Sequence, residues 1–149
     1  MRFTKILILG AALATSTAAR PAPQPATAPL TITVYHSPTC GCCKKWVEYL
    51  KADGFTVKSI EQADLTEIKT ELGVAPKLRS CHTAVIAGYV IEGHVPAADI
   101  KRLLSEKPRI TGLTAPGMPQ SAPGMDMGKE PFEVLAFDGK GATTVWAMH

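Results

Sequence analysis

The sequence predicts an α/β fold, and three patterns lead to this prediction. A run rich in β-branched residues at 30–35 is followed closely by an amphipathic helical pattern that begins near Gly41. A second apolar run, at 83–91, contains a single central glycine, which is typical of a β-hairpin. A further helical pattern lies between Pro96 and Pro108. With 149 residues, the chain is long enough for one domain with its own hydrophobic core.

The N-terminal residues have the pattern of a secretory signal peptide, which we assign to residues 1–19. Arg2 and Lys5 supply its positive charge, and an apolar run follows at 6–14. Small residues at 17–19 provide a cleavage site. A spanning helix needs about 20 apolar residues, so this run is too short, although an uncleaved anchor is the alternative. We therefore expect an exported protein, periplasmic in a bacterium, that has no membrane contact after signal cleavage.

Residues 20–30 are rich in proline and alanine and are predicted to form a flexible tether. Loss of Arg2 and Lys5 with the signal would leave 14 basic residues against 13 acidic ones, a net charge of about +1. The chain contains no block of lysines and arginines interleaved with aromatic residues. Composition therefore excludes nucleic acid as an expected partner.

The first helix is predicted at 41–52 and has two different faces. Cys43 and Val47 belong to an apolar stripe with helical spacing, whereas lysines and a glutamate occupy the opposite face. Because Cys43 lies on the stripe, we expect its side chain to point toward the core. Cys40 and Cys42 are then expected at the exposed start of the helix.

A second strand at 55–60 and a short helix at 64–72 follow the first helix. In the short helix, Leu65, Ile68 and Leu72 are expected to face the core. The hairpin and the final helix complete the order β-α-β-α-β-β-α, which is the thioredoxin-like arrangement. In this arrangement a helical crossover joins parallel strands and a hairpin completes the sheet.

The chain changes character after this arrangement. The tetrapeptide Ala-Pro-Gly-Met occurs at 115–118 and again at 122–125, and Met127 follows the second copy. Because glycine and proline disfavour both helix and strand, we predict a methionine-bearing loop at 112–128. Two β-like runs separated by an Asp-Gly turn predict a terminal hairpin at 132–147.

Three of the four cysteines lie within four residues and the fourth is distant: Cys40, Cys42, Cys43 and Cys81. In an oxidising compartment, four cysteines suggest disulfides. A bridge between Cys40 and Cys43 closes a very short loop and stabilises by only about 2 kcal/mol, which disfavours a purely structural role. The same pair has the spacing of a thioredoxin redox site, where the helix N-terminus favours a thiolate. In that reaction Cys40 would be the nucleophile and Cys43 the resolving thiol.

The extra thiol of Cys42 favours metal binding over disulfide exchange. Adjacent cysteines splay apart, which disfavours a single tetrahedral zinc ion and suits sulfurs that bridge two or more ions. Soft sulfur ligands select Cu(I), and thioethers bind this ion as well. We therefore predict one or more Cu(I) ions at the four cysteines, with three methionines as weaker candidates: Met118, Met125 and Met127. The alternative is that these methionines fill gaps beneath the loop.

The four histidines are expected to differ in role and location. His82 is adjacent to Cys81 and is predicted to bind the metal, orient the thiol or cap a turn. His36 precedes the cysteine turn and is a weaker candidate at its rim. His94 is expected at the surface, and His149 at a disordered chain end.

Three separated segments resemble the CopG-like family of small exported proteins, long catalogued as a domain of unknown function and associated with copper resistance. These segments are the CxCC-containing stretch at 35–43, the Ser-Cys-His-Thr-Ala stretch at 80–84, and the Gly-Met stretches within 112–125. The resemblance implies a thioredoxin-like domain at 31–149 and copper binding, with a redox role in detoxification. The residues it carries over are Cys40, Cys42, Cys43 and Cys81, with Met118 and Met125 at the family's Gly-Met positions.

The sequence thus predicts a periplasmic copper-binding protein whose partners are copper ions and other periplasmic copper-handling proteins. No proline stands near 81–82, where thioredoxin-like proteins keep a cis-proline, so Cys81 is expected to face the cysteine turn from there. Two alternatives remain open: a thioredoxin-type thiol–disulfide oxidoreductase and a passive copper metallochaperone. The sequence does not decide whether the protein is an enzyme.

Overall fold

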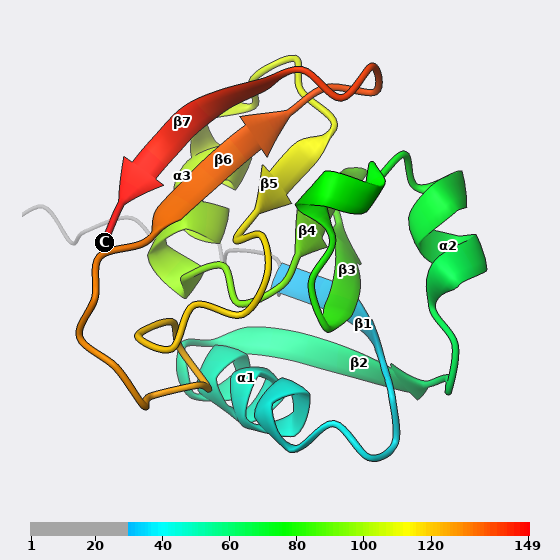
Figure 1. The fold of residues 1–149 in the computed structure, drawn as a ribbon, viewed down its shortest axis with the longest axis vertical. Coiled ribbons are helices and arrows are strands. Elements are labelled where there is room, and N and C mark those ends of the chain that lie inside the picture. The colour runs from blue at the N-terminus through cyan, green and yellow to red at the C-terminus, as the bar shows by residue number, and fades with distance from the viewer. Residues whose placement is uncertain (1–29) are drawn as a thin grey trace, which may run out of the picture.

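The computed structural model describes residues 30–149. The predicted signal peptide at 1–19 and the tether at 20–30, apart from Leu30, lie outside the described residues. The strands are β1 (Leu30–His36), β2 (Phe55–Glu61), β3 (His82–Ile86), β4 (Tyr89–Glu92), β5 (Gly112–Thr114), β6 (Glu133–Phe137) and β7 (Thr143–Met148). The helices are α1 (Gly41–Ala52), α2 (Thr66–Glu71), the 3-10 helix η1 (Pro76–Leu78) and α3 (Ala97–Glu106). The predicted mixed α/β class is confirmed (Figure 1).

The strands form one sheet in the order β2-β1-β3-β4-β5-β6-β7. Strands β1 and β2 are parallel and joined by the crossover helix α1, whereas β3 is antiparallel to both β1 and β4. Strand β5 then pairs in parallel with β4, and the β6–β7 hairpin continues the sheet from there. The C-terminal segment therefore extends the same sheet rather than forming a separate layer.

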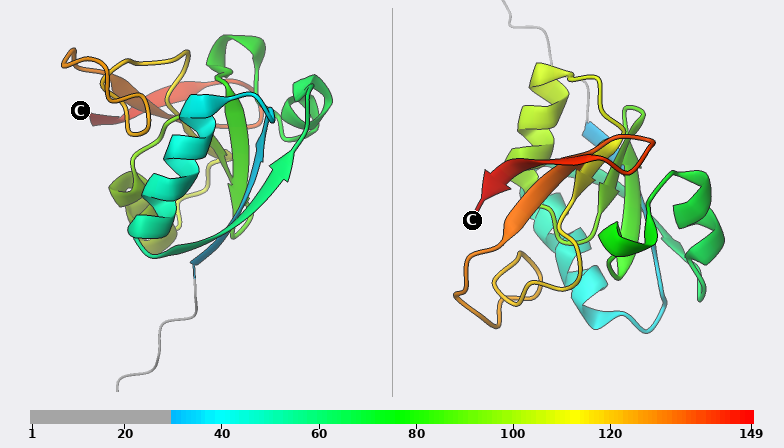
Figure 2. Two further views of the ribbon diagram at one scale, coloured as in Figure 1. Left: turned by 90° about the horizontal axis from the view of Figure 1, so that it is seen from below. Right: turned by 45° about the horizontal axis from the view of Figure 1, so that its top comes forward.

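Helices α1 and α3 lie side by side on one face of the sheet, and α2 lies on the other (Figure 2). Trp46 of α1 is fully buried and donates its indole N–H to the carbonyl of Val95, 3.0 Å away, just before α3. Because side chains alternate along a strand, His82 faces α1 while Thr83 faces α2. The two faces of β3 thus pack against different helices, α1 on one side and α2 on the other.

The segment predicted as a loop at 112–128 begins with a short strand, so this prediction needs correction. Gly112 starts β5, and a Cβ atom there would lie 1.8 Å from the carbonyl oxygen of Val90. The close approach requires glycine, which the local sequence pattern indicates only as a turn signal. The rest of the loop is held against the domain, since Ala115 and Ala122 are fully buried. The terminal hairpin is confirmed, with β7 extending to Met148.

Helix α2 also differs from its predicted orientation. Leu65 is buried as expected, but Ile68 and Leu72 are only half-buried. The buried residue within the helix is Lys69, with 5% of its surface exposed. Its partners come from other elements, which is why the apolar pattern of the helix alone does not predict it. Within residues 30–149, none of the helices is both long and apolar enough to cross a bilayer.

Candidate metal centre

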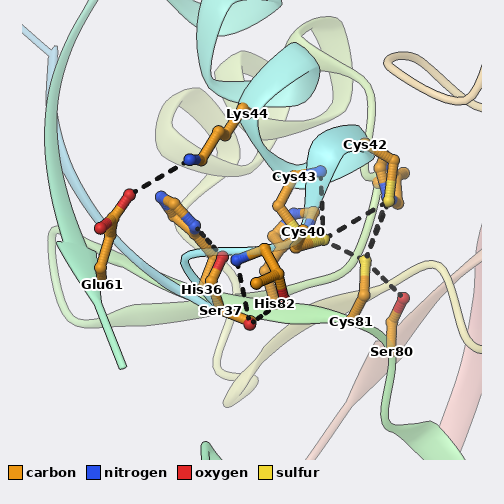
Figure 3. Close-up of a disulfide and its surroundings, with 12 residues drawn as sticks. His36, Ser37, Cys40, Cys42, Cys43, Lys44, Glu61, Ser80, Cys81 and His82 are labelled. Atoms are coloured by element: carbon orange, nitrogen blue, oxygen red, sulfur yellow. Dashed lines mark hydrogen bonds and ion pairs between the residues drawn. A yellow bond between two sulfur atoms is a disulfide. The ribbon is translucent and has the colours of Figure 1, made fainter. Parts of the chain in front are cut away.

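The start of α1 brings three sulfurs together. Cys40 is the N-cap residue, and its Sγ accepts a hydrogen bond from the backbone N–H of Cys43 at 3.3 Å. Cys40 and Cys43 form a disulfide, and Cys43 is fully buried on the core side as predicted. Cys42 is a free, half-buried thiol whose Sγ lies 3.5 Å from that of Cys40 (Figure 3).

Cys81 completes this group from the segment that precedes β3. Its free thiol lies 4.0 Å from the Sγ of Cys42, which is 39 residues earlier in the chain. All four sulfurs lie within 4.8 Å of one another. The expectation that Cys81 faces the cysteine turn is therefore confirmed. Among residues 30–149, every peptide bond is trans, as predicted for the 81–82 position.

Two imidazoles lie against Cys81 and form a second group with it. His94 Nε2 is 3.2 Å and His82 Nδ1 is 3.3 Å from the Cys81 sulfur. His94 is fully buried, so the expectation that it lies at the surface is wrong. Its position follows the β4 strand end, and no local motif in the sequence marks it. Only the hairpin register, which returns the chain to the start of β3, brings it to the sulfur.

The hydrogen bonds of His94 define the state of its ring. Nδ1 lies 2.8 Å from the carbonyl oxygen of Pro123, and a carbonyl can only accept, so Nδ1 carries the proton. In the neutral ring, Nε2 therefore directs its lone pair at the Cys81 sulfur. The Nε2 atom of His82 is buried without a hydrogen-bond partner in the described part of the chain. Both rings therefore have nitrogen atoms suited to a proton or a metal ion.

Burial sets the protonation of this group. It raises the pKa of the Cys81 thiol to about 12, and the neighbouring Cys42 sulfur adds to the increase. It also lowers the pKa of His82 and of His94. In His82, the nearby His94 and Lys69 charges lower the pKa further. At neutral pH the site therefore contains a protonated Cys81 thiol beside two neutral imidazoles.

The other residues predicted as weaker metal ligands lie outside these two groups. His36 is buried, and its Nδ1 and Nε2 contact the Ser37 carbonyl and the Ser59 hydroxyl at 2.9 and 2.6 Å. It does not join either group of potential ligands. Met125 is half-buried, whereas Met118 and Met127 are 55% and 78% exposed.

The two copies of the repeated tetrapeptide each contact one of the cysteine-bearing segments. The carbonyl of Gly117, in the first copy, accepts from the hydroxyl of Ser80, next to Cys81. In the second copy, a Cβ atom at Gly124 would lie 2.8 Å from the Trp46 nitrogen and 3.1 Å from the Cys42 carbonyl. The loop therefore packs directly on the start of α1 and on the segment that carries Cys81.

This arrangement offers soft ligands in two oxidation states of the protein. With the Cys40–Cys43 disulfide closed, two thiols and two imidazoles remain. With the disulfide reduced, four sulfurs become available within the same small volume. Thiolate and imidazole ligands suit copper better than they suit hard cations such as Mg²⁺ or Ca²⁺.

Fold and site together define a mixed α/β protein with a cysteine cluster that can bind a soft metal ion. Residues 78–125 match a family model described as "Protein of unknown function, DUF411". Two solved structures, named copper resistance protein CopG forms 1 and 2, are 43% and 42% identical to the chain, with TM-scores of 0.76 and 0.77. Each match covers 81% of this chain and 98% of the other.

The chain therefore belongs to the family of copper resistance protein CopG. A comparison with curated protein sequences gives no match. The family resemblance inferred from the separated motifs is confirmed, because both solved structures share more than 40% of their residues with this chain over 81% of its length. The family model in addition matches residues 78–125, which include the Cys81 segment.

Proposed function

We propose that this protein binds Cu(I) through the thiolates of four cysteines and contributes in this way to copper resistance. The observation that carries the proposal is the convergence of four sulfurs, from two segments 39 residues apart, within 4.8 Å. The ligands in this proposal are Cys40, Cys42, Cys43 and Cys81. The copper-resistance name of the related structures supports copper as the ion, and the sulfur donors favour its Cu(I) state.

The oxidation state of the protein controls how many ligands it offers. Reduction of the Cys40–Cys43 disulfide takes up two electrons and two protons and gives two further thiols. Binding then releases thiol protons, including the strongly held proton of Cys81. The helix N-terminus stabilises negative charge on Cys40, whose sulfur already accepts a backbone N–H. A redox role in copper handling is consistent with these features.

Other groups assist at the edge of the site in this proposal. His94 and His82 are placed to bind an ion together with Cys81, because their ring nitrogens approach its sulfur. Met118, Met125 and Met127 serve as weaker or transient ligands, in keeping with the exposure of Met118 and Met127 and the half-buried position of Met125. His36 is the weakest candidate, since both of its ring nitrogens have protein partners.

We also propose that residues 31–149 form one thioredoxin-like domain and that the mature protein works in the periplasm. The order β2-β1-β3-β4, with parallel β1 and β2 and an antiparallel hairpin, supports the fold assignment. The signal-like pattern at 1–19 supports export. Copper ions and other periplasmic copper-handling proteins are the partners expected there.

An anaerobic Cu(I) titration of the reduced protein, with a competing chelator, tests this function. We expect the wild-type protein to compete strongly and the Cys42→Ser variant to bind fewer copper ions, because Cys42 is the sulfur positioned between Cys40 and Cys81. A variant with all four cysteines changed to serine is the control. Wild-type binding no tighter than that of the control would rule out the proposed site.

Thiol–disulfide exchange is the second candidate, and the closed Cys40–Cys43 disulfide at a helix start favours it. Once a reducing dithiol partner has opened this bridge, the Cys40 thiolate attacks a substrate disulfide and forms a mixed disulfide. Cys43 then attacks Cys40, which releases the substrate thiol and closes the Cys40–Cys43 disulfide again. Disulfide reductase activity that is lost in Cys40→Ser but kept in Cys42→Ser, together with weak copper binding by the wild-type protein, would favour this candidate.

A further inference from the structure

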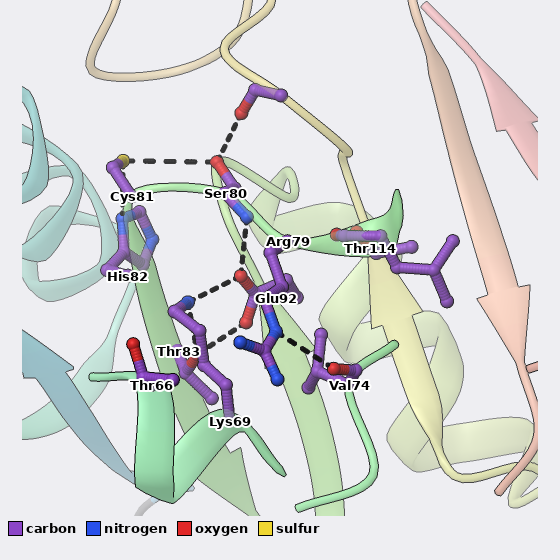
Figure 4. Close-up of polar contacts among 12 residues, drawn as sticks. Thr66, Lys69, Val74, Arg79, Ser80, Cys81, His82, Thr83, Glu92 and Thr114 are labelled. Carbon is purple, nitrogen blue, oxygen red and sulfur yellow. Dashed lines mark hydrogen bonds and ion pairs between the residues drawn. The ribbon is translucent and has the colours of Figure 1, made fainter. Parts of the chain in front are cut away.

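A buried charged cluster lies directly beneath the Cys81 segment, on the face of the sheet opposite α1. Glu92 of β4 is fully buried, and its Oε1 is 2.5 Å from the ammonium group of Lys69 on α2. The same oxygen accepts the backbone N–H of Ser80 at 2.6 Å. The other carboxylate oxygen accepts the Thr83 hydroxyl, which in turn lies 2.7 Å from Lys69 Nζ (Figure 4).

A contribution to the free energy of unfolding is a weak explanation for a buried ion pair in this position. Two charges removed from water lose hydration energy, and replacing such a pair with apolar residues of similar size is often neutral or stabilising. An apolar pair, however, cannot accept an N–H group. The Glu92 carboxylate accepts from three donors on three different segments: Lys69, Ser80 and Thr83.

The donors of Glu92 lie on both sides of Cys81 in the chain. Ser80 immediately precedes it, and Thr83, two residues after it, pairs with Glu92 across the hairpin. Residues 79–81 belong to no helix or strand, so they lack a regular hydrogen-bond ladder to fix them. The Ser80 N–H to Glu92 bond therefore ties the irregular Cys81 segment to strand β4, which is paired on both sides within the sheet.

From this geometry we infer that the Lys69–Glu92 pair is a positioning device for the site. Glu92 fixes the Ser80 backbone and so holds the Cys81 sulfur beside Cys42, and Lys69 keeps the carboxylate charged and oriented. The inference rests on the proposed function in one respect, because copper binding is the reason why the Cys81 sulfur has to be held beside Cys42. The placement of Cys81 itself can be tested without copper.

The test uses the full chain with Cys40→Ser and Cys43→Ala, so that Cys42 and Cys81 are the remaining thiols. Phenylarsine oxide captures two neighbouring thiols by forming two As–S bonds with release of water, and intact mass spectrometry follows the rate. Two matched variants are compared in this background: K69M/E92Q and K69M/E92M. Both lack the charges and have similar volume, but only the glutamine variant keeps an oxygen that accepts the Ser80 N–H.

We expect K69M/E92Q to capture the reagent within about twofold of the background rate, and K69M/E92M to be slower by about tenfold. A monofunctional alkylating reagent serves as the control and should label both variants fully. Equal capture rates in two folded variants would overturn the inference. If either variant does not fold, hydrogen exchange of the wild-type protein decides: the Ser80 amide should be as protected as the amides of β4, and rapid exchange would overturn the inference.

Copper titration of the same variants separates the two proposals. Slower arsenical capture in K69M/E92M, in a protein whose wild-type form binds no Cu(I), would retain the positioning role and reject the proposed function. Equal capture rates in the two variants, with normal Cu(I) binding by the wild-type protein, would reject the positioning role and retain the proposed function.

Discussion

At the residue scale, Cys81 differs from the other sulfurs because it lies between two buried imidazoles and a free thiol. His94 contacts its sulfur with one ring nitrogen and the loop carbonyl of Pro123 with the other. This ring therefore connects the loop to the cluster. In metal sites, a histidine whose second nitrogen is held by a carbonyl has a fixed orientation and a more basic ligand atom.

Substitution of His94 should weaken copper binding without abolishing it. We expect the His94→Gln variant to lose about tenfold or more in Cu(I) affinity, because the nitrogen beside Cys81 is lost. The matched control is His149→Gln, whose imidazole pairs with Asp99 outside the cluster. Chelator competition measures both, and an equal affinity loss in the two variants would contradict a role for His94 at the site.

The buried imidazoles also predict how the stability of the copper-free protein depends on pH. Folding lowers the pKa of His82 and His94, so below about pH 6.5 the unfolded chain takes up protons that the folded protein excludes. Their contribution to stability is thus complete above that pH and is lost as the pH falls. From pH 7.5 to 6.0 the free energy of unfolding should decrease by up to about 1.5 kcal/mol.

Chemical denaturation at several pH values measures this effect. The interval ends at pH 6.0 because burial raises the pKa of Glu92, which acts in the opposite direction at lower pH. In the His94→Gln variant the decrease should be about half as large, since one of the two groups is removed. A pH-independent free energy of unfolding in the wild-type protein would show that these imidazoles do not titrate as described.

At the scale of elements, the glycines of the two tetrapeptide copies share a left-handed backbone angle but lie in different environments. Gly117 and Gly124 both have positive φ angles, 70° and 84°. A Cβ atom at Gly117 would meet nothing within 4 Å, whereas at Gly124 it would press on the backbone of α1. The first copy therefore needs glycine for its backbone angle alone, and the second needs it for the angle and for close packing as well.

Alanine substitutions distinguish these two needs. Gly117→Ala should lower the free energy of unfolding by about 1 kcal/mol, the cost of the left-handed conformation. Gly124→Ala should lower it by about 3 kcal/mol, because the loop must also move away from α1. Urea denaturation of the copper-free proteins gives both values. Equal losses would indicate that the second copy does not pack on the helix.

At the scale of the whole molecule, the cluster joins two parts of the fold. Its sulfurs come from the α1 start and from the segment before β3, and the C-terminal loop contacts both. A ligand bound by both segments stabilises the folded state, because the unfolded chain cannot hold the sulfurs together. Copper should therefore act on global stability and not only on the loop.

Thermal or urea unfolding in an anaerobic Cu(I) buffer tests this coupling. With free Cu(I) at 100 times the dissociation constant, the reduced protein should gain about 2.7 kcal/mol per independent site. The Cys42→Ser variant is the control and should gain less. Unfolding that does not respond to Cu(I), in a protein that does bind it, would place the ion on one segment alone.

Much of the fold follows from local sequence pattern, and part of the site does as well. Helix α1 has the bounds predicted from its apolar stripe, and the cysteine turn lies at its start. Strand β5 and the buried Lys69 were not predicted, because each depends on a partner far away in the chain: β4 for the strand and Glu92 for the lysine. His94 was placed wrongly for the same reason.

The sequence by itself determined the order of β1 to β4 with helices α1 to α3, the terminal hairpin and the soft chemistry of the donors, because periodicity and residue type are local properties. Tertiary structure alone decided which donors meet. The hairpin register brings His94 to Cys81, and sheet pairing brings Cys81 to Cys42. These contacts depend on backbone hydrogen bonds between distant segments, which no single stretch of sequence specifies.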